Sequence, residues 1–317
     1  MTEKESKSNY TKFLICNMGK CGLIFILKVE LISQGGGHMS ITISILADDR
    51  VTKSGFIAEH GFSAFVKTDD EAFLFDAGQG MVLHHNARMM GINLCDNENV
   101  ILSHGHYDHA NGVRMLYCNS KIRIYSHPVI LQSRFKKTAP DEYKNIGIEW
   151  LDNAVVTDKI EWNLSEQPQV LSGNLVLSGQ IPRITDFEAS DEPFYILNEQ
   201  RRYEPDEILD DQALFISTKL GIIIVTGCAH SGLVNTVLHA RKVLNQDKIH
   251  AIVGGTHLLH ASTERLAKTV QFLQSAGVDL LYAGHCTGFE PACYLKSQLK
   301  EKYSILEVGL QIVFDAV

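Results

Sequence analysis

The chain has 317 residues, of which 45% are hydrophobic and 21% are charged, a composition typical of a globular protein with one large domain or two small ones. Its formal net charge of −8 provides no global positive field, which argues against nucleic acid or an acidic lipid surface as a partner. The seven cysteines are odd in number and have no repeating spacing, so we interpret them as reduced thiols of a cytoplasmic protein.

Residues 1–38 precede the first regular pattern, and we interpret them as a leader outside the fold. Their most apolar stretch, Phe13 to Leu31, is interrupted by two lysines and a glutamate, so we expect no transmembrane span and no membrane partner. Three glycines and His38 then separate this stretch from Met39. The alternative is an extra native strand followed by a flexible glycine linker. We predict that residues 39–317 form the folded domain.

From Met39 onward, short apolar runs alternate with helical patterns. Strands are predicted where such runs are bounded by turn residues, at Ile41–Ala47, Ser63–Lys67, Ala72–Asp76, Asn99–Ser103 and Lys121–Ser126. Helices are predicted at Met81–Met90 and Pro128–Phe135. Residues 138–210 are polar and weakly periodic, and we interpret them as an insertion or a lid near the functional site.

The second half has a clearer pattern. It predicts strands and helices in alternation, at Gly221–Thr226, Leu233–Leu244, His250–Val253, Thr263–Ala276, Leu280–Ala283, Pro291–Lys300 and Gln311–Phe314. Ser262 or Thr263 is expected to cap the helix that follows it. This order suits an α/β fold in which two mixed sheets pack face to face with helices outside.

The segment from Ser103 to His109 reads Ser-His-Gly-His-Tyr-Asp-His and directly follows a predicted strand. Imidazole nitrogens and carboxylate oxygens are good ligands for zinc, manganese or iron. In an extended loop His104 and His106 point the same way, while Asp108 and His109 can turn toward a second ion. Two such ions can activate a water molecule, and Asp108 could accept its proton as the catalytic base. The alternative is a histidine-rich surface loop.

Three more histidines follow predicted strands in the second half. His230 lies in Gly-Cys-Ala-His-Ser-Gly, His257 in Gly-Gly-Thr-His and His285 in Gly-His-Cys-Thr-Gly. A single histidine at such a position is usually structural. Three of them in a chain that already has the first motif favour a metal site. We expect Cys286 and Cys293 to be packing residues.

The His-x-His-x-Asp-His motif after a strand resembles the metallo-β-lactamase superfamily, which implies an αββα sandwich. The resemblance also implies that His230 and His285 are metal ligands alongside His104, His106, Asp108 and His109. Asp76, in Phe-Asp-Ala-Gly, would orient a ligand histidine, although turn chemistry also explains this carboxylate. The superfamily usually has one more ligand for the second ion, an aspartate or cysteine, but no aspartate ends the predicted strand Gly221–Thr226. Either Cys228 or His257 replaces it, or the second ion is held more weakly.

Several further strings resemble one branch of that superfamily, the 7,8-dihydropterin-6-methyl-4-(β-D-ribofuranosyl)aminobenzene-5′-phosphate synthase-like family. They span about residues 41–314 and include Glu59-His60-Gly61, Gly179-Gln180-Ile181-Pro182-Arg183, Asp210-Asp211-Gln212 and the three histidine strings of the second half. The resemblance implies the joining of a dihydropterin methyl diphosphate to an aminobenzene ribofuranosyl phosphate.

We therefore expect a metal-dependent hydrolase or transferase acting on a small anionic, phosphorylated molecule. The cofactors would be two divalent transition-metal ions, with zinc first and manganese or iron as alternatives. Arg183 could clamp the anionic substrate, or it could be a surface residue that pairs with Glu188. The alternatives are a nuclease or phosphodiesterase of the same fold, and a non-catalytic metal-binding sensor.

Overall fold

The structure, a computed structural model, describes residues 40–189, 192–198 and 200–315. All of these residues belong to the unit Leu31–Val317. The predicted leader, residues 1–38, lies outside the described residues and stays a prediction. Within the described ranges, no helix is long and apolar enough to cross a membrane.

The described residues form two seven-stranded sheets and one four-stranded sheet. The first large sheet has the order β18-β1-β2-β3-β4-β5-β8, with bounds Gln311–Phe314, Ile41–Ala47, Ser63–Lys67, Ala72–Phe75, Asn99–Ile101, Ile122–Ser126 and Ile160–Leu164. The second has the order β17-β16-β15-β14-β13-β10-β9, with bounds Tyr303–Ile305, Leu280–Gly284, Ile249–Gly255, Gly221–Thr226, Ala213–Thr218, Leu175–Leu177 and Gln169–Ser172. The small sheet has the order β12-β11-β6-β7, with bounds Tyr203–Pro205, Phe194–Leu197, Arg134–Ala139 and Glu142–Asn145.

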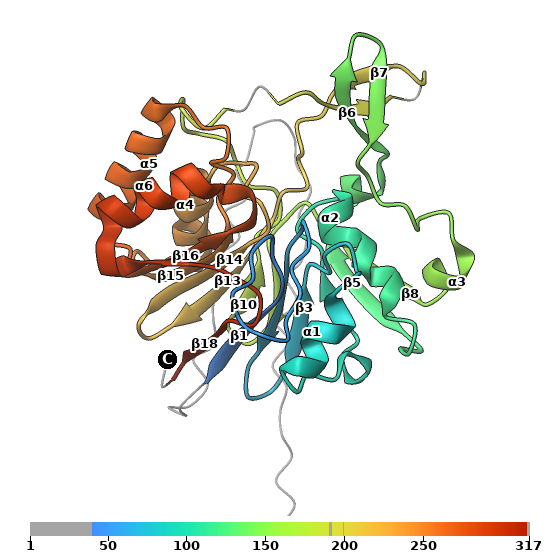
Figure 1. The fold of residues 1–317 in the computed structure, drawn as a ribbon, viewed down its shortest axis with the longest axis horizontal. Coiled ribbons are helices and arrows are strands. Elements are labelled where there is room, and N and C mark those ends of the chain that lie inside the picture. The colour runs from blue at the N-terminus through green and yellow to red at the C-terminus, as the bar shows by residue number, and fades with distance from the viewer. Residues whose placement is uncertain (1–39, 190–191, 199, 316–317) are drawn as a thin grey trace, which may run out of the picture. The chain divides into compact units, whose positions relative to one another are not determined.

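The predicted fold class, two mixed sheets with helices outside, is confirmed (Figure 1). Both large sheets contain parallel and antiparallel pairs, such as β3 with β4 and β1 with β2 in the first sheet. The helices are α1 (Leu83–Met89), α2 (Tyr107–Ala110), α3 (Ala154–Thr157), α4 (Leu233–Leu244), α5 (Thr263–Ser275) and α6 (Phe289–Leu299). Ser262 caps α5, because its side chain accepts a hydrogen bond from the Arg265 backbone N–H.

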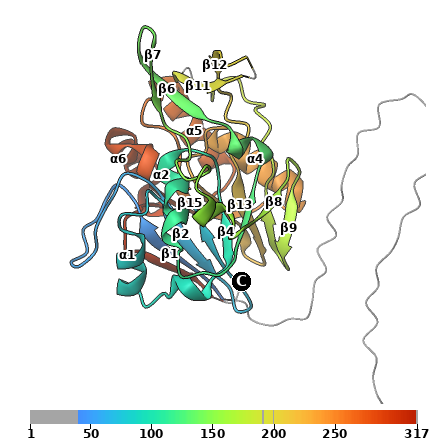
Figure 2. The same ribbon diagram turned by 90° about the vertical axis from the view of Figure 1, so that its right-hand side faces the viewer.

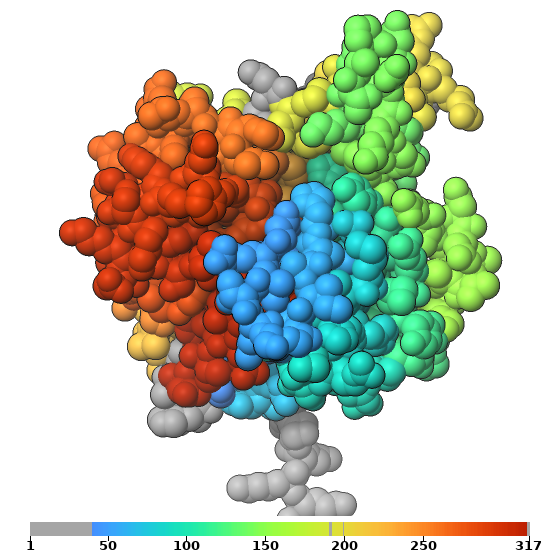
Figure 3. Space-filling view, viewed as in Figure 1, coloured from blue at the N-terminus to red at the C-terminus, as the bar shows by residue number. Residues whose placement is uncertain are grey.

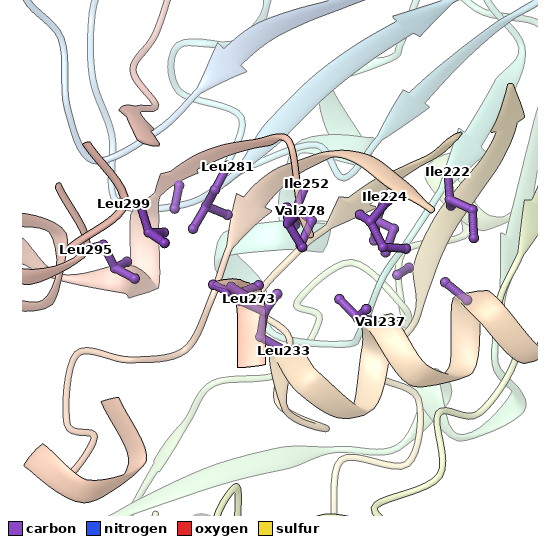
Figure 4. Close-up of a cluster of buried hydrophobic side chains, with 14 of the residues drawn as sticks. Ile222, Ile224, Leu233, Val237, Ile252, Leu273, Val278, Leu281, Leu295 and Leu299 are labelled. Atoms are coloured by element: carbon purple, nitrogen blue, oxygen red, sulfur yellow. The ribbon is translucent and has the colours of Figure 1, made fainter. Parts of the chain in front are cut away.

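The residues of strand β14 contribute alternately to two hydrophobic clusters, one on each face of the second sheet. All six of its residues are buried, and successive side chains point to opposite faces of the sheet. Ile222 and Ile224 pack with α4, α5 and α6 in an outer cluster (Figure 4). Ile223 and Val225 pack in an inner cluster with residues of the first sheet, including Phe75. An uninterrupted apolar run is therefore required here, since water reaches neither face.

The chain between the two halves differs from the sequence prediction. The predicted helix Pro128–Phe135 is wrong: a 3₁₀ turn covers Pro128–Leu131, and β6 begins at Arg134. Arg134 is fully buried and forms ion pairs with Asp206 and Asp210, which fixes the start of that strand. The strands of residues 138–210, predicted as an insertion or a lid, are distributed over all three sheets. Strands β8, β9 and β10 belong to the two large sheets, and only β6, β7, β11 and β12 form the separate small sheet.

Two of the cysteines are paired. A disulfide joins Cys95 to Cys118, across a connection between the 3₁₀ turn Leu94–Asp96 and the loop before β5. The expectation that the cysteines are all reduced thiols is therefore wrong for this pair, which sequence spacing alone did not reveal. Among the described residues, the free thiols are those of Cys228, Cys286 and Cys293.

Candidate metal centre

The candidate ligands follow strands that end at the same edge of each large sheet. Asp76 follows β3 and His104 comes shortly after β4, while His230, His257 and His285 come after β14, β15 and β16. Asp76, His257 and His285 have left-handed backbone φ values of 54°, 51° and 47°. Such conformations cost energy in residues other than glycine, and they concentrate at functional sites. The backbone is thus bent where these side chains are presented.

His104, His106 and His230 form the first cluster of potential ligands, called here the three-histidine group. Nε2 of His104 lies 3.0 Å from Nδ1 of His106, and the ring centroids of His104 and His230 are 4.7 Å apart. Burial, together with the neighbouring imidazoles, lowers the pKa of all three side chains well below the ordinary value of 6.5. Neutral imidazoles have a free lone pair, which is the form that binds metal.

Asp108, His109 and His285 form the second cluster, called here the Asp108 group. Oδ2 of Asp108 lies 3.9 Å from Nε2 of His109 and 3.6 Å from Nε2 of His285, and those two nitrogens are 3.1 Å apart. Burial raises the pKa of the Asp108 carboxyl, but the surrounding histidines outweigh burial and hold it below 3.8. The carboxylate is therefore ionised at neutral pH.

Asp76 orients one histidine ring of each group, on the side away from the pocket. It is fully buried and accepts hydrogen bonds from the backbone N–H and the hydroxyl of Ser103, both at 2.7 Å. Its Oδ2 also lies 2.7 Å from Nδ1 of His109, and the Ser103 hydroxyl lies 2.9 Å from Nδ1 of His104. One carboxylate thus fixes a ring in each group, which is how buried carboxylates commonly orient ligand histidines.

Asp49 orients the ring of His285 in the way that Asp76 orients His109, through a contact with Nδ1. Its Oδ1 lies 2.7 Å from Nδ1 of His285, and its Oδ2 lies 2.8 Å from Nδ1 of His60. Burial lowers the pKa of His285, but the bond to Asp49, together with the negative charges of Asp49, Cys286 and Asp108, outweighs burial and raises this pKa to about 10. The dyad therefore favours a positive charge at Nε2 of His285, where either a proton or a metal ion would be stabilised.

Two of the expected extra ligands lie beside these groups. Sγ of Cys228 is 3.2 Å from Nε2 of His109 and can form a cluster with His104 and His109, so it lies between the two groups. The His257 ring packs 4.1 Å from the His230 ring, and its Nε2 forms a close ion pair with Glu192. Cys286 is not only a packing residue, because its Sγ accepts a hydrogen bond from the His257 backbone N–H at 3.3 Å.

The donor atoms of this centre suit two transition-metal ions. The three-histidine group offers nitrogen ligands, and the Asp108 group offers two nitrogens and one carboxylate oxygen. Nε2 of His106 and Nε2 of His230 are buried and have no hydrogen-bond partner among the residues that the structure describes. A buried polar atom without a partner is costly, and a bound cation would satisfy it.

A pocket of about 290 Å³ opens over the two groups. Its floor includes His106, Asp108, His230 and His285, so residues of both groups are accessible from it. The other side is formed by the small sheet, whose hairpin β6–β7 projects over the end of α2 that carries the motif (Figures 1 and 2). The surface is hollowed between this green hairpin and the orange C-terminal half (Figure 3).

The sequence did not single out every residue of the site. Asp49, His60 and Glu192 all line the pocket, and only His60 belonged to a string used for the family resemblance. Arg183, by contrast, does not line this pocket. It is exposed and donates hydrogen bonds to the backbone oxygens of Glu207 and Ile208. Its guanidinium therefore stabilises the loop between β12 and β13. Nor does it pair with Glu188, which binds backbone N–H groups of α4.

Comparison with known proteins gives matches over most of the chain. The family described as the Metallo-beta-lactamase superfamily matches residues 57–285. Over 291 residues the chain is 32% identical to the 7,8-dihydropterin-6-methyl-4-(beta-D-ribofuranosyl)-aminobenzene-5'-phosphate synthase of Methanocaldococcus jannaschii, covering 87% of this chain and 97% of that protein. It is also 32% identical, over 254 residues, to an uncharacterised protein of the same organism, covering 78% of this chain and 91% of that protein.

Solved structures show the same likeness. The crystal structure of Tm1679, described as a metal-dependent hydrolase of the beta-lactamase superfamily, matches with a TM-score of 0.73 and 29% identity, covering 86% of this chain and 98% of that one. The metallo-beta-lactamase fold protein YhfI from Bacillus subtilis matches with a TM-score of 0.54 and 13% identity, covering 86% of this chain and 99% of that one. The second match bears on the fold alone.

Proposed function

Because the chain belongs to the metallo-beta-lactamase superfamily, we propose that it is a metal-dependent hydrolase or transferase acting on a small phosphorylated molecule. The observation that carries the proposal is the meeting of the three-histidine group and the Asp108 group at the floor of one pocket. His104, His106 and His230 would hold one divalent ion, and Asp108, His109 and His285 a second. Zinc is the first candidate, with manganese or iron as alternatives.

When bound, such ions supply Lewis-acid stabilisation of a phosphate leaving group and lower the pKa of water. The chain's own side chains would do the rest. Asp108, ionised and facing the pocket, can accept a proton from the attacking group. His60 lies 3.4 Å from Asp108, and its bond to Asp49 raises its pKa, so a protonated His60 can stabilise negative charge beside the reaction centre.

The finer proposal is the pterin reaction of the Methanocaldococcus relative. The name of that relative describes a product with a dihydropterin, an aminobenzene ring and a ribofuranosyl 5′-phosphate. A 32% identity over 97% of its length supports a related substrate for this chain. Group transfer and hydrolysis would use the same centre. Either the aminobenzene nitrogen or water would attack the methyl carbon, the bond from this carbon to the diphosphate oxygen would break, and the diphosphate would leave.

A nuclease of the same fold is the second candidate function, and the net charge of −8 argues against it. A non-catalytic metal sensor is the third. Turnover assays would separate these functions. The substrates are a phosphodiester, a lactone, and the dihydropterin methyl diphosphate together with the aminobenzene ribofuranosyl phosphate. A nuclease should convert the phosphodiester, and a sensor should convert none of them.

Metal analysis tests the proposal directly. The purified protein should contain about one to two transition-metal ions per chain, because histidine-rich sites hold such ions tightly. The variant His230→Gln should lose metal and activity. His239→Gln is the matched control, since His239 is a half-buried histidine that bonds the Ser178 carbonyl far from the ligand groups. Full activity in a metal-free preparation would overturn the proposal.

A further inference from the structure

We propose that the pocket side of the small sheet is a binding subsite for a phosphate group of the substrate, formed by Lys136 and Lys144 with Phe194 beside them. The proposal rests on the proposed function and adds to it the residues that recognise the substrate. All three side chains line the pocket above the ligand groups.

The three residues form one row across the small sheet. Lys136 of β6 is paired with Lys144 of β7 on one side and with Phe194 of β11 on the other. Residues that are directly opposite each other in antiparallel strands have their side chains on the same face. The row therefore runs across three strands on one face, and the pocket lies against that face.

The charges of this row are unbalanced. Two ammonium groups directly opposite each other repel, which destabilises a strand pair. Neither Lys136 nor Lys144 forms an ion pair with any residue that the structure describes. Lys136 interacts at longer range with Glu192, but that carboxylate is held by His257. An anion bound between the two lysines would remove the repulsion, and phosphate is the anion that lysines commonly bind as point charges.

Within this row, Phe194 is the residue that contacts the metal ligands. Its ring centroid lies 5.0 Å from that of His106 and 5.9 Å from that of His230, and the Lys136 ammonium lies 5.8 Å from the same ring. The Phe194 ring thus lies between the ligand groups and the two lysines. This arrangement fits a substrate with a reacting group at the metal centre, an apolar or planar part over Phe194 and a second phosphate between the lysines.

The neighbouring residue Lys137 provides a matched control. It lies on the same strand but on the opposite face, where its ammonium is 5.7 Å from the Tyr143 ring, and it does not line the pocket. Lys137→Gln removes the same charge from the same hairpin, so it separates a local contact from a general effect of net charge.

The experiment measures binding of ribose 5-phosphate and of ribose by calorimetry to the metal-loaded protein at fixed ionic strength. Wild type should bind ribose 5-phosphate at least about tenfold more tightly than ribose. The double variant Lys136→Gln/Lys144→Gln should lose most of this preference, while Lys137→Gln should keep it. Equal affinities in all three proteins would overturn the proposal. Because binding needs no turnover, a protein that converts no substrate but binds the sugar phosphate through these lysines would refute only the proposed function.

Thermal unfolding checks that the variants fold, and it provides a second readout. Lys144 is exposed, so the substitution Lys144→Gln removes no packing. It should raise the thermal midpoint of the protein without ligand slightly, because the cross-strand repulsion is gone, and it should reduce the rise in midpoint that ribose 5-phosphate produces. An unchanged ligand-induced rise in Lys144→Gln would also contradict the subsite.

Discussion

At the scale of single residues, Asp108 combines two properties that a catalytic carboxylate needs. It is buried beside His109 and His285, and the histidines hold its pKa below the ordinary value, so it is ionised at neutral pH. Asp108→Asn should leave the thermal midpoint nearly unchanged, because the shape is conserved, and lower kcat by about a hundredfold or more. The measurement is kcat with metal content determined on the same sample.

The exposed Asp152 offers a control for that substitution, because Asp152→Asn changes the same charge outside the site. An Asp108→Asn protein with full activity would assign the role of base and ligand elsewhere, to Cys228 or His257 as the neighbouring donors.

The residues of the candidate centre differ in how far sequence could predict them. His104, His106, Asp108 and His109 stand within six positions after a strand, so their spacing alone indicates a metal site. Asp49 and Glu192 carry no such signal, since single carboxylates are common on every surface. Each becomes meaningful only after folding, when Asp49 contacts His285, which lies 236 positions later.

At the scale of elements, prediction succeeded for several elements with one or both faces buried, but the buried strands β10 and β13 were not predicted. The predicted and observed bounds agree for Gly221–Thr226, Leu233–Leu244 and Gln311–Phe314. Strand β12 is exposed throughout and β7 nearly so, and such strands leave no alternation of apolar and polar residues to read. The sequence therefore predicted a polar insertion or a lid near the functional site, without the bounds of the small sheet's strands, which form one side of the pocket.

The N-terminus of α4 depends on a carboxylate from another segment. Glu188 is buried and accepts hydrogen bonds from the backbone N–H groups of Val234 and Asn235, at 2.8 and 2.9 Å. Glu188→Ala leaves those donors without a partner, so it should lower the free energy of unfolding by about 1–2 kcal/mol. Thermal unfolding of the variant should show a midpoint lower by a few degrees.

The effect of Glu188 should also depend on pH. Burial raises the pKa of this carboxyl above the ordinary value of 4.5. Since the folded state then holds the proton more tightly than the unfolded state, the contribution to stability is full below pH 4.5 and falls as pH rises through the folded-state pKa. Urea unfolding of wild type and Glu188→Ala across this range should give a difference that shrinks with rising pH. Glu264→Ala, at an exposed position on α5, is the control. If the difference in unfolding free energy between wild type and Glu188→Ala grew with pH, the prediction would be wrong.

At the scale of the whole molecule, the alternation of strands and helices was enough to predict two mixed sheets with helices outside. The centre itself needs both halves, because His104, His106, Asp108 and His109 come from the first sheet and His230, His257 and His285 from the second. Sequence order could not show how these two edges meet. The meeting follows from the inner cluster, in which strands of both sheets bury their apolar faces against each other.

Residues 1–38 should be dispensable for the folded domain. Strand β1 begins at Ile41 and already has a partner on each side, β18 and β2, so it offers no free edge to a preceding strand. Ser40, just before it, is held by Asp69 and Asp315. A chain starting at Met39 should therefore match the full chain in metal content, activity and thermal midpoint. A loss of about 1 kcal/mol would lower the midpoint by a few degrees, which thermal unfolding can resolve. An insoluble product or such a decrease would mean that the apolar stretch Gly22–Ile32 packs against the domain, and the leader interpretation would then be wrong.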